Sequence, residues 1–319
     1  MKTKFYDISI LRVIAMLLVV YYHCICTYGM WGAAFDSGDR FLIYDKLLPL
    51  LSQTHLPIFF IIAGYLFGYK RLRGGYGDTR QFLKDKATRV LVPYVTVGIF
   101  IVAIKECRGG TLLVGTISHL WFLITIFECY AIGKLIDFVM YENARNRLLI
   151  FLFACFSMVI WCRYGTILGS IFTLYFSFYL IGMLMSTINI ERITTKQKLL
   201  LCASFLFLCL MIAEVWIEYR ATLLRSVSIW FVFTLFLWFR TLKINDIPNW
   251  LKSLDTCSMG IYIVHHIIIR QLCRTDIGRT MFHIHYYAFP IILFVVVLLV
   301  SWAIVYQLKK YKFSKYFIG

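Results

Sequence analysis

The chain has 319 residues, of which 61% are hydrophobic and only 15% are charged, and its mean hydropathy is +0.77. A water-soluble fold cannot bury that much apolar surface, and the composition also excludes a disordered, a collagen-like or a disulfide-scaffold chain. The apolar residues form long blocks instead of strands of about ten alternating residues, so a barrel is excluded as well. We therefore expect an all-α fold, a polytopic bundle of transmembrane helices.

The charge of the chain has a topological meaning. Its 33 Lys and Arg against 16 Asp and Glu give a net charge of +17, which on one face of a soluble domain would suggest nucleic acid. Here the cations stand in short clusters between apolar blocks, so no nucleic-acid partner is expected. The ten cysteines lie almost all inside apolar blocks without the ligand spacing of a zinc site, so we expect packing residues and no metal.

Ten apolar blocks of near-spanning length follow one another, and we expect each to be a membrane helix. The first resembles a signal peptide but contains Arg12 and His23 and lacks a small-x-small cleavage site, so it is expected to be retained. Three blocks are short, which leaves nine or eleven spans open. The blocks are 8–28, 47–69, 90–104, 119–138, 147–162, 167–187, 198–217, 222–240, 257–273 and 286–308.

The distribution of cations predicts the orientation. With both termini cytoplasmic, the inner segments carry 22 of the Lys and Arg and the outer segments 10, with Arg12 inside the first helix. This bias follows the positive-inside rule. Residues 70–89 are then a cytoplasmic loop whose turn is Gly74-Gly75-Tyr76-Gly77. No loop is long enough for another domain, so residues 1–319 are expected to form a single membrane domain.

Two residues of the first helix are candidates for chemistry. Arg12 and His23 stand in a segment that hydrocarbon surrounds, where ionisable side chains are costly and usually functional. Their spacing of eleven residues puts them on one helix face, about 16 Å apart along the axis. Snorkelling of Arg12 to the headgroups and a structural hydrogen bond of His23 are the alternatives.

Cationic and titratable residues follow in the next helices. Lys86 and Arg89 share a face at the mouth of the third helix, which suits a phosphate group or, alternatively, anionic lipid headgroups. His119 and Trp121 begin the fourth span, and Glu128 lies two turns deeper, where an unpaired carboxylate must face a cavity or a partner. His265 and His266 stand in the ninth span, where bonds to a neighbouring helix are the alternative to a chemical role.

These stretches together resemble the acyltransferase 3 family of integral membrane acyltransferases over nearly the whole chain. The first-helix arginine and histidine match its most specific element, and Lys86 with Arg89 stands for its Arg-x-x-Arg pattern. In the second-helix pattern Ala63 replaces the usual serine. The other matching residues are Ala15, Pro57, Phe59, Phe60, Gly64, Tyr65, His119 to Leu123, Tyr262 and His265.

The resemblance implies an O-acyltransferase of the cell membrane, of the stand-alone type without a fused esterase-like domain. It would move an acyl group, most often acetyl, from cytosolic acyl-CoA to a hydroxyl of an extracytoplasmic glycan, such as an exopolysaccharide, or of a lipid-linked saccharide. Acyl-CoA is then a donor substrate, and no permanently bound cofactor is expected. The alternatives are a secondary transporter of an anionic or saccharide substrate and a non-catalytic assembly factor. A homo-oligomer is left open.

The resemblance also suggests roles. His23, expected in the outer half of the bilayer, is the general base, and Arg12 orients the thioester or neutralises phosphate. Glu128 or His119 orients His23 or the acceptor. Lys86 and Arg89 bind the donor with Arg12, whereas His119, Trp121, Tyr65 and His265 are expected to bind the acceptor.

Overall fold

The computed structural model describes residues 5–28, 42–103, 118–164, 171–189, 192–218, 221–242, 244–285 and 287–319, and every regular element in these ranges is helical. The predicted all-α class is therefore confirmed. The helices are α1 (Tyr6–Ile25), α2 (Leu42–Ser52), α3 (His55–Leu72), α4 (Thr79–Ala103), α5 (Trp121–Glu142), α6 (Ala144–Tyr164), α7 (Ile171–Met185), α8 (Thr195–Glu218), α9 (Ala221–Thr241), α10 (Asn249–Arg274), α11 (Asp276–Ile284), α12 (Phe289–Leu308) and α13 (Lys315–Ile318).

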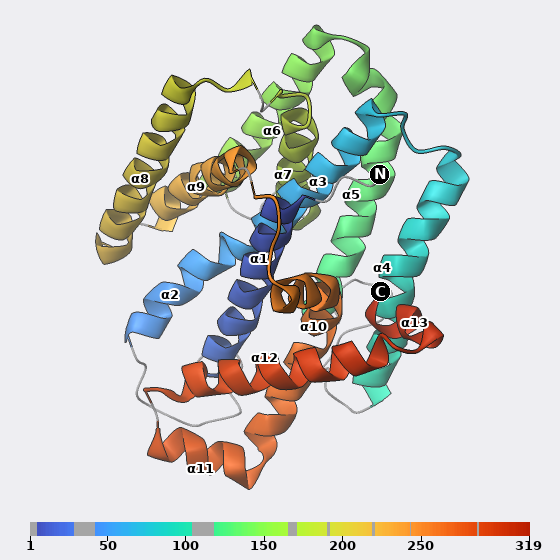
Figure 1. The fold of residues 1–319 in the computed structure, drawn as a ribbon. Coiled ribbons are helices and arrows are strands. Elements are labelled where there is room, and N and C mark those ends of the chain that lie inside the picture. Colours follow the sequence, from blue (N-terminus) through green and yellow to red (C-terminus); the bar gives the residue numbers. More distant parts are fainter. Residues whose placement is uncertain are drawn as a thin grey trace.

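The helix α1 runs through the middle of the bundle beside α10, with α8 and α9 at one edge and α4 with the short α13 at the other (Figure 1). One side of α1, which includes Leu11 and Val19, packs into a core shared with α3, α4, α5, α7 and α9. Its other side, which includes Met16 and Val20, packs into a second core with α10 and α12. Because α1 is packed on both sides, its polar residues are held in fixed positions.

The helices α3 and α7 approach each other through glycine. A Cβ atom added to Gly64 would overlap the carbonyl oxygen of Tyr179, and one added to Gly182 would overlap that of Ile61. The two backbones therefore touch where neither residue has a side chain, as is common between membrane helices.

Several element boundaries differ from the hydropathy blocks. The block 47–69 is two helices, α2 and α3, separated at Gln53 and Thr54. Pro57 has no N–H to donate to the Gln53 carbonyl four residues earlier, and its ring crowds that carbonyl. The helices α4 and α10 begin well before residues 90 and 257, since their first turns carry charges that a hydropathy scan rejects. The helix α11 was not predicted.

The surface has the apolar character expected in a bilayer. Within the described residues, four helical stretches are long and apolar enough to cross a membrane, namely Tyr6–Ile25, Ile43–Leu72, Thr79–Ala103 and Phe289–Leu308. Large apolar side chains also stand exposed along α6 and α12, among them Phe156, Val159, Val295 and Leu299. So much exposed apolar surface marks a lipid-facing protein. That the other predicted blocks also cross the membrane stays a prediction.

Two ends of the bundle can be distinguished by their contacts. Phe5, just before α1, packs edge-on against Tyr69 near the C-terminal end of α3. Thr96 of α4 donates a hydrogen bond to the carbonyl of Tyr316, so the short α13 packs against α4. The turn after α3 is also here, and Gly74 and Gly75 adopt the positive φ angles of 110° and 77° that the glycine-rich sequence predicted. We call this the basic end; His23 lies toward the other.

We predict that the basic end faces the cytoplasm. A membrane-impermeant thiol reagent applied to sealed cells should label a cysteine introduced by Asp36→Cys and spare one introduced by Asp78→Cys, because the second lies in the cation-rich loop. Peptide mass spectrometry separates the introduced site from the native cysteines. Position 36 lies outside the described residues. Labelling of position 78 with protection of position 36 would reverse the orientation.

Candidate active site

A cavity of about 390 Å³ lies between α1, α3, α5, α7 and α10, away from the basic end. Five of the seven histidines of the sequence gather at it. Four of them line the wall, and His265 stands behind His23. The lining residues are Val19, Tyr22, His23, Cys26, Ser52, His55, Leu56, His119, Trp121, Tyr175, Tyr262 and His266. No charged aspartate, glutamate, lysine or arginine belongs to this described lining.

The helices α1 and α10 run in the same direction and are joined at two levels. Near the basic end, Nη1 of Arg12 donates to Oδ1 of Asp255 at 2.8 Å. At the cavity, Nδ1 of His23 lies 2.9 Å from Nε2 of His265. Arg12 and His23 are eleven residues apart on α1, and Asp255 and His265 are ten residues apart on α10. Because these spacings are nearly equal, both pairs can form at the same time between two parallel helices. Arg12 and His23 thus share a helix face, as their spacing predicted.

The ring of His119 is fixed by its neighbours. Its Nε2 lies 2.9 Å from the carbonyl of Ile263, and Tyr262 donates its hydroxyl proton to the carbonyl of His119. A carbonyl only accepts, so Nε2 of His119 carries the proton and Nδ1 the lone pair. That Nδ1 is buried and has no hydrogen-bond partner in the described structure. The structure thus leaves one acceptor unsatisfied on a residue that lines the cavity.

Aromatic faces complete the wall. The rings of Trp121 and Tyr175 lie 5.4 Å apart, and the ring of His266 stacks on that of His119 at 4.5 Å. Across the cavity, His55 of α3 lies against Tyr22 at 5.1 Å. Rings, hydroxyls and neutral imidazoles suit an uncharged polar ligand better than an anion. Despite the many histidines, no group of three or more metal-ligating side chains in the described residues has the geometry for a metal ion.

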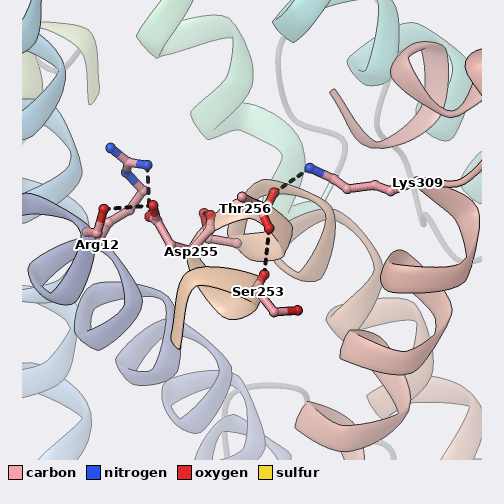
Figure 2. Close-up of polar contacts among 7 residues, drawn as sticks. Arg12, Ser253, Asp255, Thr256 and Lys309 are labelled. Carbon is pink, nitrogen blue, oxygen red and sulfur yellow. Dashed lines mark hydrogen bonds and ion pairs between the residues drawn. The ribbon is translucent and has the colours of Figure 1, made fainter. Parts of the chain in front are cut away.

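The basic end carries a cationic cluster around Asp255. Figure 2 shows Arg12 on one side of Asp255, with Lys309 reaching the carbonyl of the neighbouring Thr256 from the other side. Ser9 donates a second hydrogen bond to Asp255 at 2.8 Å. Desolvation and, to a smaller extent, the guanidinium of Arg89 lower the pKa of Lys309. The cluster of Arg12, Lys309 and Asp255 has a net positive charge.

Lys86 at the start of α4 is half-buried. Its ammonium stands over the ring of Tyr130, 3.8 Å from the centroid, whereas Arg89 one turn later is exposed. A cation over an aromatic face keeps its charge and is held in position. The two residues share the first turns of α4, as the sequence predicted, and Arg89 is the more exposed of the two.

Two predicted site residues lie apart from the cavity. Tyr65 of α3 is not with His119 and Trp121 but near the basic end, where its hydroxyl accepts a hydrogen bond from Arg240 at 2.9 Å. Arg240 also pairs with Asp7, so Tyr65 belongs to a structural ion pair that ties α9 to α1. Glu128 is half-buried on α5 and does not line the cavity. The side chain that the structure brings to His23 is His265, whose Nε2 lies 2.9 Å from Nδ1 of His23.

Sequence reasoning missed three residues that the structure brings to these sites. Asp255 and Lys309 lie outside the predicted spans, and nothing in the sequence singles out His55. One signal for Asp255 was present: it precedes His265 by almost the interval that separates Arg12 from His23. Such matched spacing on two helices predicts two matched contacts if the helices run in parallel.

Comparison with known families gives one match. The family model of the acyltransferase 3 proteins, described as an acyltransferase domain, matches residues 5–306. No curated protein and no solved structure matches the chain. The match runs from the residue before α1 almost to the end of α12, so it includes the cavity and all of the cationic cluster except Lys309.

Proposed function

Because the chain belongs to the acyltransferase 3 family, we propose that it transfers an acyl group, acetyl in the first place, from cytosolic acyl-CoA to a hydroxyl of an extracytoplasmic glycan or lipid-linked saccharide. The family match confirms the resemblance found in the sequence and, with the apolar helices, makes the chain a membrane acyltransferase. One observation carries the finer proposal: α1 holds Arg12 in a cationic cluster and His23 in an uncharged cavity, three turns apart.

In the proposed reaction, His23 is the general base. It takes the proton of the acceptor hydroxyl while that oxygen attacks the thioester carbonyl carbon. The new C–O bond of the ester forms, the C–S bond breaks, and the thiolate of CoA leaves with the proton that His23 returns. Acyl-CoA is a substrate here, and the cell membrane is the proposed location. The position of His23 on the cavity wall supports this role.

The donor is proposed to enter from the basic end. Its phosphates need an electropositive seat, and the side chains of Arg12, Lys86, Arg89 and Lys309 supply four cations against the single carboxylate of Asp255. The distance of about 16 Å between Arg12 and His23 along α1 is then bridged by the extended arm that carries the thioester. A cationic site that is separate from an uncharged cavity suits two substrates of different chemistry, a donor with phosphates and a neutral acceptor.

The acceptor is proposed to bind in the cavity. His119 lines the cavity and has an unsatisfied acceptor at Nδ1, and Trp121 offers a ring to the same cavity. Among the described lining residues there is no arginine or lysine for a phosphate or carboxylate group. These features support a neutral, hydroxyl-bearing part of a saccharide as the acceptor.

A transporter is the competing function, and one experiment separates the two. Purified protein in detergent is given acetyl-CoA with and without a polysaccharide acceptor, and free thiol release is followed over time. An acyltransferase releases CoA thiol in amounts that rise with the acceptor and match the ester formed. A transporter or an assembly factor leaves the thioester intact under both conditions.

The donor site gives a kinetic prediction. Lys86→Ala and Arg89→Ala should each raise the KM for acyl-CoA more than they lower kcat, because they remove binding that is equal in the ground state and the transition state. Lys84→Ala, an exposed lysine of the same helix, is the matched control and should change neither constant. An unchanged KM together with poor membrane yield would instead assign Lys86 and Arg89 to lipid anchoring.

A further inference from the structure

His265 is the most enclosed histidine of the site. Its side chain has 0% of its surface exposed, and it is absent from the cavity wall. A substrate in the cavity therefore meets His23 and not His265. Both ring nitrogens of His265 are nonetheless engaged, one by the carbonyl of Ile261 and the other by His23.

The two contacts fix where the protons lie. Nδ1 of His265 is 3.0 Å from the carbonyl oxygen of Ile261, and because a carbonyl only accepts, Nδ1 carries the proton. In a neutral imidazole the other nitrogen then has the lone pair. Nε2 of His265 must accept the hydrogen bond at 2.9 Å, so Nδ1 of His23 donates it.

The alternative is a doubly protonated His265, which burial disfavours. A charged imidazole with no exposed surface needs a counter-ion, and no carboxylate among the described residues is bonded to this ring.

We propose that His265 is a positioning residue that holds the proton of neutral His23 on Nδ1, so that Nε2 of His23 carries the lone pair that receives the acceptor's proton. This inference rests on the proposed role of His23 as the base. When Nε2 takes that proton, the ring becomes a cation, and its Nδ1–H bond to neutral His265 becomes charge-assisted and stronger. His23 then returns the Nε2 proton to the leaving thiolate, while His265 keeps its own proton throughout.

The test compares two substitutions that differ in one property. His265→Leu removes the acceptor, and His265→Gln offers an amide oxygen at similar reach. We expect His265→Leu to lower kcat by about tenfold to hundredfold, as loss of a charge-assisted hydrogen bond does, with both KM values unchanged. His265→Gln should recover most of that loss. The control is His283→Gln, an exposed histidine of α11.

A second measurement does not depend on turnover. Diethyl pyrocarbonate reacts with an imidazole lone pair, and peptide mass spectrometry reports its rate at His23 in the absence of substrates. That rate should fall in His265→Leu and return in His265→Gln. Wild-type kcat in a folded His265→Leu variant, or equal losses in both variants with unchanged labelling of His23, would overturn the proposal.

The same experiments distinguish a failure of the proposed role of His265 from a failure of the proposed acyl transfer. If His265→Leu does not fold, His265→Gln alone decides, since a loss as large as that of His23→Ala would contradict a replaceable acceptor. If wild-type protein shows no transfer at all, the proposed function fails. The labelling of His23 in the two variants still measures whether His265 holds the tautomer.

Discussion

His23→Ala is expected to reduce acyl transfer by about 10²–10⁴-fold, the range that a positioned general base contributes. The imidazole of His23 is the group on α1 that can accept and return a proton during one transfer, and it lies on the cavity wall. Removal of the ring should leave the KM for acyl-CoA nearly unchanged, because the cationic cluster is three turns away. A glycan acetylation assay with membranes of known protein content measures the effect.

Folding must be controlled in this experiment. The ring of His23 is half-buried, so its loss enlarges the cavity without removing a large part of either core. His23→Gln keeps more of the volume and should be as inactive as His23→Ala, since an amide is not a base at neutral pH. Both variants should migrate as wild type in size-exclusion chromatography. If His23→Ala membranes modify the acceptor at the wild-type rate, the mechanism is wrong.

Most of the fold could be predicted, because hydropathy measures the free energy of moving a side chain from water into lipid. The same free energy drives apolar helices into the membrane. The charged first turns of α4 and α10 could not be placed by that signal, because they extend past the apolar part of each helix. The break between α2 and α3 depends on a missing N–H at Pro57, which composition does not register. The glycines at 74 and 75 were predictable, since their positive φ angles demand glycine.

The sequence predicts which site residues share a face of one helix, but not which residues of another helix they contact. A spacing of eleven residues places Arg12 and His23 on one face of α1 by geometry alone. The partners Asp255 and His265 stand more than 240 residues away, and local periodicity carries no information on such pairings. His265 and His266 illustrate the limit, because adjacent residues point about 100° apart on a helix. One lies behind His23 and the other on the wall, and sequence does not distinguish them.

Arg12→Ala is expected to raise the KM for acyl-CoA by about tenfold to hundredfold, as loss of a hydrogen bond to a charged group does. The guanidinium uses Nη1 to bond Asp255, and its side chain is 28% exposed, so its other N–H groups can meet a phosphate. The same change leaves the carboxylate of Asp255, 16% exposed, without its cation and should lower the melting temperature.

A charge exchange separates these two effects. In the double variant Arg12→Asp with Asp255→Arg, the ion pair between α1 and α10 can form again with its polarity reversed, so the melting temperature should return toward that of wild type. The KM should stay high, because a carboxylate now stands on α1 where the donor phosphate is expected. Asp255→Asn, which keeps a side chain of the same shape beside Ser9 and Arg12, should not raise the KM. Recovery of both properties in the double variant would show that Arg12 serves only to join the two helices, and the route of the donor along α1 would have to be abandoned.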